Sequence, residues 1–120
     1  MAGDGDPMDG QVLLLAAAKA SVSPQRLPDL VDLAQAHLGD RLAEYRREYE
    51  VAFTEPDRVG FFVEADHWDD LGGRLGFDDN ETDALRRVHA AQLRRVGTDA
   101  GRRDEFETAL EIREAVVIGR

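Results

Sequence analysis

Apolar residues recur at helical spacing through the first third of the chain. A continuous apolar run fills residues 12–18, and Asp9 stands where it can cap a helix that carries this run. Pro24 and Pro28 then interrupt the pattern, because proline suits only helix starts and turns. A second stripe follows at i, i+3, i+4, i+7 and i+11, which predicts an amphipathic helix. Its members are Leu27, Leu30, Val31, Ala34 and Leu38.

The segment 28–50 can form either one helix or two. Gly39 followed by Asp40 offers a helix end and then a new N-cap, which favours two helices joined by a tight bend. The apolar spacing nevertheless continues without a break, as one long helix would require, through Leu38, Leu42, Tyr45 and Tyr49. We expect two helices, with one long helix as the alternative.

Alternation of apolar and polar residues replaces the helical spacing on both sides of Pro56-Asp57. Proline suits the second position of a tight turn, so the pattern predicts a β-hairpin. The alternating apolar residues are Tyr49, Val51 and Phe53 before the turn and Val59, Phe61 and Val63 after it. Because an isolated hairpin is marginal in water, it must pack on helices, on a third strand or on another subunit. The β-branched stretch 116–118 is the candidate third strand.

Three further helical patterns follow the hairpin, at about 66–76, 79–97 and 102–115. Together the elements predict a mainly α fold of the α+β class, a compact bundle of five to six helices with one central β-hairpin. The 120 residues match the size of one domain. We expect residues 1–8 to form a disordered acidic tail and residues 9–120 to form a single α-rich domain.

Charge is the strongest signal in the composition. The chain has 25 acidic residues against 15 basic ones, a net charge of −10, and Lys19 is its single lysine. Self-repulsion destabilises such a compact chain, but in 1 M salt the Debye length falls to about 3 Å and the repulsion fades. The composition therefore favours a cytoplasm that accumulates salt. The alternative is a GC-rich genome, whose codons favour arginine over lysine.

Several classes of function and location are disfavoured. Without cysteine the chain cannot form a disulfide, a thiolate metal site or a cysteine nucleophile. The apolar run 12–18 is too short to span a bilayer and follows acidic residues, so we expect a cytoplasmic protein that does not bind membranes. There is no phosphate-binding glycine loop, serine-nucleophile motif or His-x-x-x-His pair. We therefore expect neither an enzyme nor a cofactor.

Three phrases of the sequence carry a resemblance to a known family. They are "LLLAAAKASVSP", "HWDDLGGRLGF" and "EFETALEIREAVV". Over about residues 12–119 the chain resembles a family of small acidic proteins from salt-loving archaea that have no assigned function. The resemblance implies a halophilic setting. It implies no activity and no functional residues.

A cluster of acids surrounds a histidine and the single tryptophan just after the hairpin. Asp66 can cap a helix with Asp69 in the capping-box position. The buried stripe and the end of this helix would be Trp68, Leu71, Gly72 and Leu75, followed by Gly76. This account leaves His67 and Glu64 unexplained. A metal or acid–base site formed by Glu64, His67 and an aspartate is the alternative, but one histidine among carboxylates is a weak ligand set, and we expect no metal.

Two polar residues interrupt the apolar stripe of the helix at 79–97. His89 and Gln92 fall on the same face as the apolar residues Leu85, Val88, Leu93 and Val96. Buried polar groups need partners, so we expect a satisfied pair in the core. The alternative is a polar spot in a groove, ligand pocket or subunit interface, for which His67, His89 and Gln92 are the candidates.

The segment 84–103 is the one basic region of this acidic chain, with six arginines against Asp99. Four of the arginines are candidates for binding an anion or an acidic partner: Arg86, Arg87, Arg94 and Arg95. The alternative is that these arginines form ion pairs with acidic residues on neighbouring helices of the same chain. No aromatic residue interleaves with them to stack on bases.

The function predicted from these features is binding rather than catalysis. We expect a non-enzymatic protein-interaction or regulatory module of a halophilic cytoplasm, whose partner is another protein or a second copy, as a homodimer through the hairpin. The alternative is a nucleic-acid-associated transcriptional regulator that uses the arginine-rich segment 86–103.

Overall fold

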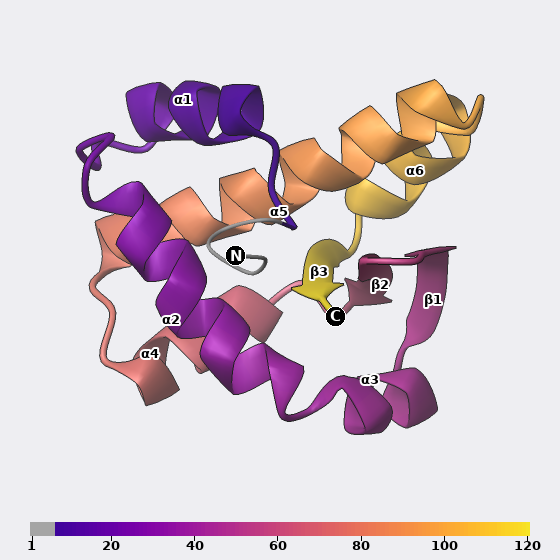
Figure 1. Cartoon of the computed structure of the whole chain (residues 1–120), viewed down its shortest axis with the longest axis horizontal. Coiled ribbons are helices and arrows are strands. Elements are labelled where there is room, and N and C mark those ends of the chain that lie inside the picture. Colours follow the sequence, from indigo (N-terminus) through magenta and orange to yellow (C-terminus); the bar gives the residue numbers. More distant parts are fainter. Residues whose placement is uncertain (1–6) are drawn as a thin grey trace.

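The computed structural model describes residues 7–120, where the hydrophobic patterns form six helices and a three-stranded antiparallel sheet (Figure 1). This arrangement confirms the predicted α+β class with its hairpin. The helices are α1 (Gly10–Lys19), α2 (Leu27–Gly39), α3 (Leu42–Glu48), α4 (His67–Leu75), α5 (Asp79–Asp99) and α6 (Arg103–Leu110). The strands are β1 (Glu50–Glu55), β2 (Arg58–Val63) and β3 (Glu114–Gly119).

The chain between residues 27 and 48 forms two helices rather than one. α2 ends at Gly39, and a two-residue bend leads into α3. In the bend, the N–H of Arg41 donates to the carbonyl of Leu38 at 2.9 Å. The tight bend predicted at this place is therefore confirmed, and the single long helix is excluded. The predicted N-cap is wrong, because Asp40 is the C-cap residue of α2 and the N-cap position of α3 is occupied by Arg41, whose side chain makes no capping hydrogen bond.

β2 is the central strand of the sheet, with β1 on one side and β3 on the other. The third strand predicted at 116–118 is thus confirmed, and Ile118 lies opposite Val59 in the β2–β3 ladder. Five consecutive residues of β2, from Val59 to Val63, are buried. The predicted alternation fails in β2 because a strand that is covered on both faces no longer needs a polar side.

β1 departs from the predicted alternation at a β-bulge between Val51 and Phe53. Ala52 is the extra residue of the bulge, and both Ala52 and Phe53 are buried, whereas Val51 is 43% exposed. The bulge shifts the side-chain alternation by one residue. The pairing with β2 that creates this shift is not visible in the spacing of one strand.

α6 is shorter than the helical pattern predicts. The pattern ran to residue 115, but α6 ends at Leu110 and β3 begins at Glu114. β3 contains Val116, Val117 and Ile118, whose β-branched side chains suit a strand, and all three are fully buried. Pairing with β2 therefore ends the helix earlier than local periodicity suggests.

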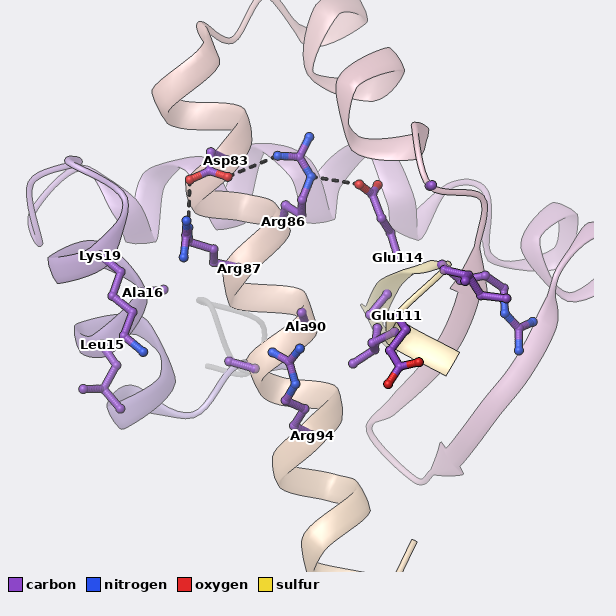
Figure 2. Close-up of a pocket in the computed structure, with 16 residues that line it drawn as sticks. Leu15, Ala16, Lys19, Asp83, Arg86, Arg87, Ala90, Arg94, Glu111 and Glu114 are labelled. Carbon is purple, nitrogen blue, oxygen red and sulfur yellow. Dashed lines mark hydrogen bonds and ion pairs between the residues drawn. The ribbon is translucent and has the colours of Figure 1, made fainter. Parts of the chain in front are cut away.

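The longest helix, α5, packs against α1, α2, α4, α6 and β3 (Figure 1). Its predicted apolar stripe is buried as expected, at Leu85, Val88, Leu93 and Val96. The faces of α5 that do not enter the core lie between α1 and the connection from α6 to β3 (Figure 2). That position makes α5 the floor of the site described below.

The predicted acidic tail is corrected where the structure describes it. Met8 is buried in the core, and Pro7 packs against Gly119 at the end of β3. The guanidinium of Arg58 also donates to the carbonyl of Pro7 at 2.9 Å. These two residues therefore belong to the folded domain, because they cover apolar surface at the end of the sheet. The rest of the predicted tail, residues 1–6, lies outside the described residues.

Candidate functional site

The start of α4 is built differently from the predicted capping box. The side chain of Asp66 makes no capping hydrogen bond. Instead, the backbone N–H of Trp68 donates to the Glu114 carboxylate at the start of β3, at 2.8 Å. A complete capping box does occur at the next helix, where Asp78 and Glu81 each accept from the other's backbone N–H. A carboxylate from a distant strand thus replaces the local cap that the sequence pattern indicated.

The end of α4 agrees with its predicted chemistry. Gly76 has a φ of 78°, the left-handed conformation that glycine adopts without steric cost. The N–H of Phe77 donates to the carbonyl of Gly72 at 2.9 Å, as in a Schellman motif. Trp68, Leu71 and Gly72 are buried, as predicted. These residues hold α4 close against α5.

His67 lies in a hydrogen-bonded cluster with two tyrosines and a glutamate. The hydroxyl of Tyr45 is 2.6 Å from Nε2 of His67, and Nδ1 is 3.4 Å from Oε1 of Glu64. Tyr49 donates to the same carboxylate oxygen at 3.4 Å. The two ring nitrogens of His67 thus have separate partners, with Tyr45 on one side of the ring and Glu64 on the other. These hydrogen bonds explain His67 and Glu64, which the predicted start of α4 did not account for.

Burial and charge set the ionisation of this cluster. Burial raises the pKa of Tyr45, and so do the nearby Tyr49 and Glu44, so the phenol stays protonated. Burial also acts to raise the pKa of Glu64, but hydrogen bonds from its own backbone and from His67 outweigh it and lower that pKa. Within residues 7–120 no group of three histidine or carboxylate side chains is arranged to hold a metal ion.

His89 and Gln92 are both fully buried, but they do not pair with each other. Nδ1 of His89 accepts from the backbone N–H of Val117 in β3 at 2.8 Å. Gln92 holds the start of α1, accepting from the N–H of Asp9 at 2.7 Å and donating to its carboxylate at 3.2 Å. Both residues therefore lie in the core, as predicted, and both bind segments that are distant in the sequence. Neither residue satisfies the other, and Nε2 of His89 has no hydrogen-bond partner among the described residues.

Burial, with a smaller effect from His67, lowers the pKa of His89 to about 3. The ring is therefore neutral at physiological pH. Since Nδ1 accepts a hydrogen bond, the ring proton lies on Nε2, which has no hydrogen-bond partner among the described residues. The ring packs beside Trp68, with the two centroids 4.5 Å apart.

The outer edge of β3 is closed by side chains from three helices. His89 of α5 takes the N–H of Val117, and the indole of Trp68 in α4 donates to the carbonyl of Ala115 at 2.8 Å. Gln35 of α2 donates to the carbonyl of Val117 at 2.7 Å and accepts from the N–H of Gly119 at 2.9 Å. Sequence reasoning missed Gln35, because nothing in its local pattern shows that it faces a strand edge. These bonds leave β3 unavailable for strand addition.

All four candidate arginines are ion-paired. Arg86 binds three acids: Asp69, Asp83 at 3.2 Å and Glu114 at 2.8 Å. Burial acts to lower its pKa, but the hydrogen bond and charge of Glu114, with those of Asp69, raise the pKa overall. The other three pairs are Arg87 with Asp83 at 2.8 Å, Arg94 with Glu107 at 2.9 Å and Arg95 with Asp9 at 3.1 Å. The arginines of this segment therefore balance acidic side chains of the same chain, which was the alternative to binding an external partner.

Three of these arginines also line a cleft of about 530 Å³ between α1, α5 and the connection from α6 to β3 (Figure 2). Its apolar lining comes from these elements, from the start of β3 and from the connection between β2 and α4: Leu15, Ala16, Ala65, Ala90, Ala91, Leu110, Ile112 and Ala115. The charged lining residues are Lys19, Asp83, Arg86, Arg87, Arg94, Glu111, Arg113 and Glu114. The cleft thus combines an apolar surface with a surplus of basic side chains.

Two large apolar side chains stand exposed on opposite sides of this cleft. Leu15 of α1 is 63% exposed and Ile112, in the turn before β3, is 75% exposed. Sequence reasoning missed this site. A signal was present in the run 12–18, because a helix cannot bury three consecutive leucines on one face. The position of Ile112 opposite that helix depends on the fold.

Within residues 7–120 no helix is both long and apolar enough to cross a membrane. Comparison with curated proteins found no significant match, and comparison with solved structures found none either. A family model described as a domain of unknown function, DUF8048, matches residues 6–120. This chain therefore belongs to the DUF8048 family of domains of unknown function.

Proposed function

We propose that this chain is a non-enzymatic protein-interaction or regulatory module that binds its partner in the cleft between α1, α5 and the α6–β3 connection. The observation that carries the proposal is the exposure of Leu15 and Ile112 across an apolar floor. Exposed apolar patches bounded by polar residues are typical of protein-binding surfaces. Within residues 7–120, the other large apolar side chains that are exposed do not line the cleft: Leu14, Leu33 and Val51.

The polar cluster around His67 supports binding over catalysis. The pocket beside Tyr45, Glu64 and His67 measures about 90 Å³, whereas small-molecule sites measure roughly 300–1,000 Å³. Burial raises the pKa of Tyr45 further from neutrality, which is the wrong direction for a phenolate base or nucleophile. A structural role at the junction of α3, β2 and α4 accounts for all of these contacts.

The proposed setting is a halophilic cytoplasm. Its support is the net charge of −10, the single lysine and the arginine ion pairs that tie α5 to its neighbours. Arginine holds carboxylates through a rigid set of donors, which suits such pairs.

Nucleic acid is the less favoured partner. No aromatic side chain lines the cleft to stack on a base, and the net charge of −10 on the chain as a whole repels a phosphate backbone. Pairing of two copies through β1 is also less favoured. The bulge interrupts that edge, and Arg102 donates to the carbonyl of Ala52 at 2.9 Å.

Capture of the native partner tests the proposal. The immobilised chain is exposed to lysate of its source cells in concentrated KCl, and retained proteins are identified by mass spectrometry. We expect one partner to be retained by the wild type and lost with Ile112→Asp. The matched control is Leu33→Asp, which introduces the same charge at an exposed leucine of α2 outside the cleft. Equal retention by both variants would contradict a binding role for the cleft.

A further inference from the structure

We infer that the cleft binds an acidic amphipathic helix of a partner protein. The apolar face of that helix lies between Leu15 and Ile112, and its carboxylates meet the basic side chains around the cleft. This inference rests on the proposed function, since it names the chemistry of the partner that the interaction module binds.

The apolar half of the site is a shallow trough between two lips. Ala16 of α1 and Ala90 and Ala91 of α5 line the trough, and their short side chains allow a partner's backbone to approach closely. Leu15 and Ile112 form the lips. Side chains at i, i+3, i+4 and i+7 of a helix make a stripe that fits a trough of this kind.

The basic half of the site distinguishes the cleft from the rest of the chain. Its lining holds five basic residues against three acids, while the whole chain carries a net charge of −10. Arg87 and Arg94 are 47% and 43% exposed and bind their acids through Nε. Their terminal nitrogens make no hydrogen bond or ion pair within residues 7–120, so each guanidinium keeps donors for a carboxylate.

Lys19 adds a further basic group at the end of α1. Its side chain reaches the cleft beside Leu15 and Ala16, and it has no ion-pair partner among the described residues (Figure 2). An acidic ligand would therefore gain a contact there without displacing an existing one.

Other occupants fit the cleft less well. Buried small ligands lose roughly 70–90% of their surface to the protein, but lips that are 63% and 75% exposed leave the site open. Two copies meeting cleft to cleft would oppose like charges across a two-fold axis. A partner strand has no edge to join here, because side chains close the outer edge of β3. A helix laid in the groove is the remaining mode of peptide recognition.

Selection from a displayed library of helical peptides tests the inference. The folded full-length chain is the target, and peptides that also bind Ile112→Asp are discarded. We expect the recovered peptides to carry Leu, Ile or Phe at helical spacing, flanked by Asp and Glu. We expect Arg87→Gln combined with Arg94→Gln to weaken their affinity at least tenfold. The control pair Arg46→Gln and Arg47→Gln on α3 removes equal charge far from α1 and should leave the affinity unchanged (Figure 1).

Three results would overturn the inference. Recovered peptides that are basic or uncharged would contradict the recognition of an acidic helix. So would peptides whose affinity is the same for the wild type and for the Arg87→Gln, Arg94→Gln variant. If a native partner is still lost with Ile112→Asp, the interaction module stands and only its chemistry is wrong. Recovery of no cleft-dependent peptide, together with oligonucleotide binding that requires Arg87 and Arg94, would overturn both the helix ligand and the proposed function.

Discussion

Gly72 shows how one residue fixes the distance between two helices. A Cβ placed on Gly72 would lie 2.2 Å from Oγ1 and 2.9 Å from Cγ2 of Thr82 in α5. The sequence places Gly72 in the buried stripe of this helix, and the structure shows that α4 approaches α5 closely at this position. A Cβ placed on the neighbouring Gly73 would have no atom within 4 Å. The two glycines of α4 therefore differ in whether another element lies against them.

Substitution of these two glycines should have opposite effects. We expect Gly72→Ala to destabilise the chain by about 1–3 kcal/mol, because the methyl group forces α4 away from Thr82. Gly73→Ala should stabilise it by about 0.5–1 kcal/mol, because alanine favours the helix and meets no neighbour. Urea unfolding of both variants measures the difference. Similar changes for both would mean that α4 and α5 are not in close contact at Gly72.

His89 makes folding stability depend on pH. Its folded pKa of about 3 lies below the unfolded value of 6.5, so the unfolded chain binds the additional proton between these pH values. The contribution of neutral His89 is therefore complete above about pH 6.5 and declines as the pH falls toward 3. The slope is about 1.4 kcal/mol per pH unit.

Comparison with His89→Gln isolates this contribution, because the amide oxygen of glutamine can accept from Val117 but does not titrate. We expect the wild type to lose about 1.4 kcal/mol more than the variant for each pH unit below about 6. Chemical unfolding at several pH values between 4 and 8 measures both curves. Parallel curves would show that the ring is not buried in its neutral form.

At the scale of elements, helix ends are stabilised either locally or from a distance. α5 begins with a complete capping box within four residues, Asp78 to Glu81. α4 begins instead with a contact from Glu114, 46 residues away. The two starts carry similar acidic residues, and only tertiary packing distinguishes them.

Substitution of Asp78 and of Asp66 should distinguish the local cap of α5 from the distant cap of α4. We expect Asp78→Ala to lower the free energy of unfolding by about 1 kcal/mol, because the N–H of Glu81 loses its acceptor. Asp66→Ala should change it by less than about 0.5 kcal/mol, as for other surface substitutions away from a cap. Thermal unfolding of the two variants measures the contrast, and an equal loss for Asp66→Ala would contradict the cap from Glu114.

At the scale of the whole molecule, the acidic charge sets the response to salt. Three exposed acids stand at the C-terminal ends of helices, where the helix dipole opposes them: Glu48, Asp99 and Glu111. Salt screens both this effect and the general self-repulsion. The chain should therefore be more stable in concentrated KCl.

We expect the unfolding temperature to rise by roughly 5 °C or more between 0.1 M and 3 M KCl, which corresponds to about 1 kcal/mol or more for a domain of this size. The combined variant Glu48→Gln, Asp99→Asn and Glu111→Gln should be more stable in low salt and gain less from KCl. Scanning calorimetry measures both chains. A wild-type midpoint that does not change with KCl would contradict the proposed halophilic setting.

Local sequence by itself determined much of this fold. The helical spacing, the Gly39-Asp40 bend, the hairpin turn at Pro56-Asp57 and the end of α4 at Gly76 all follow from interactions between residues a few positions apart. Composition likewise determined the acidic surface. These features are readable because periodicity and turn chemistry act over short distances along the chain.

Only the tertiary structure decided how distant segments meet. The bulge in β1, the early end of α6 and the partners of His89 and Gln92 depend on pairings between segments far apart in the sequence. The arginines were visible as a charged segment, but their acids lie on other elements. The cleft joins Leu15, Arg94 and Ile112, which share no local pattern. Their proximity arises because burial of the core packs α1, α6 and β3 around α5.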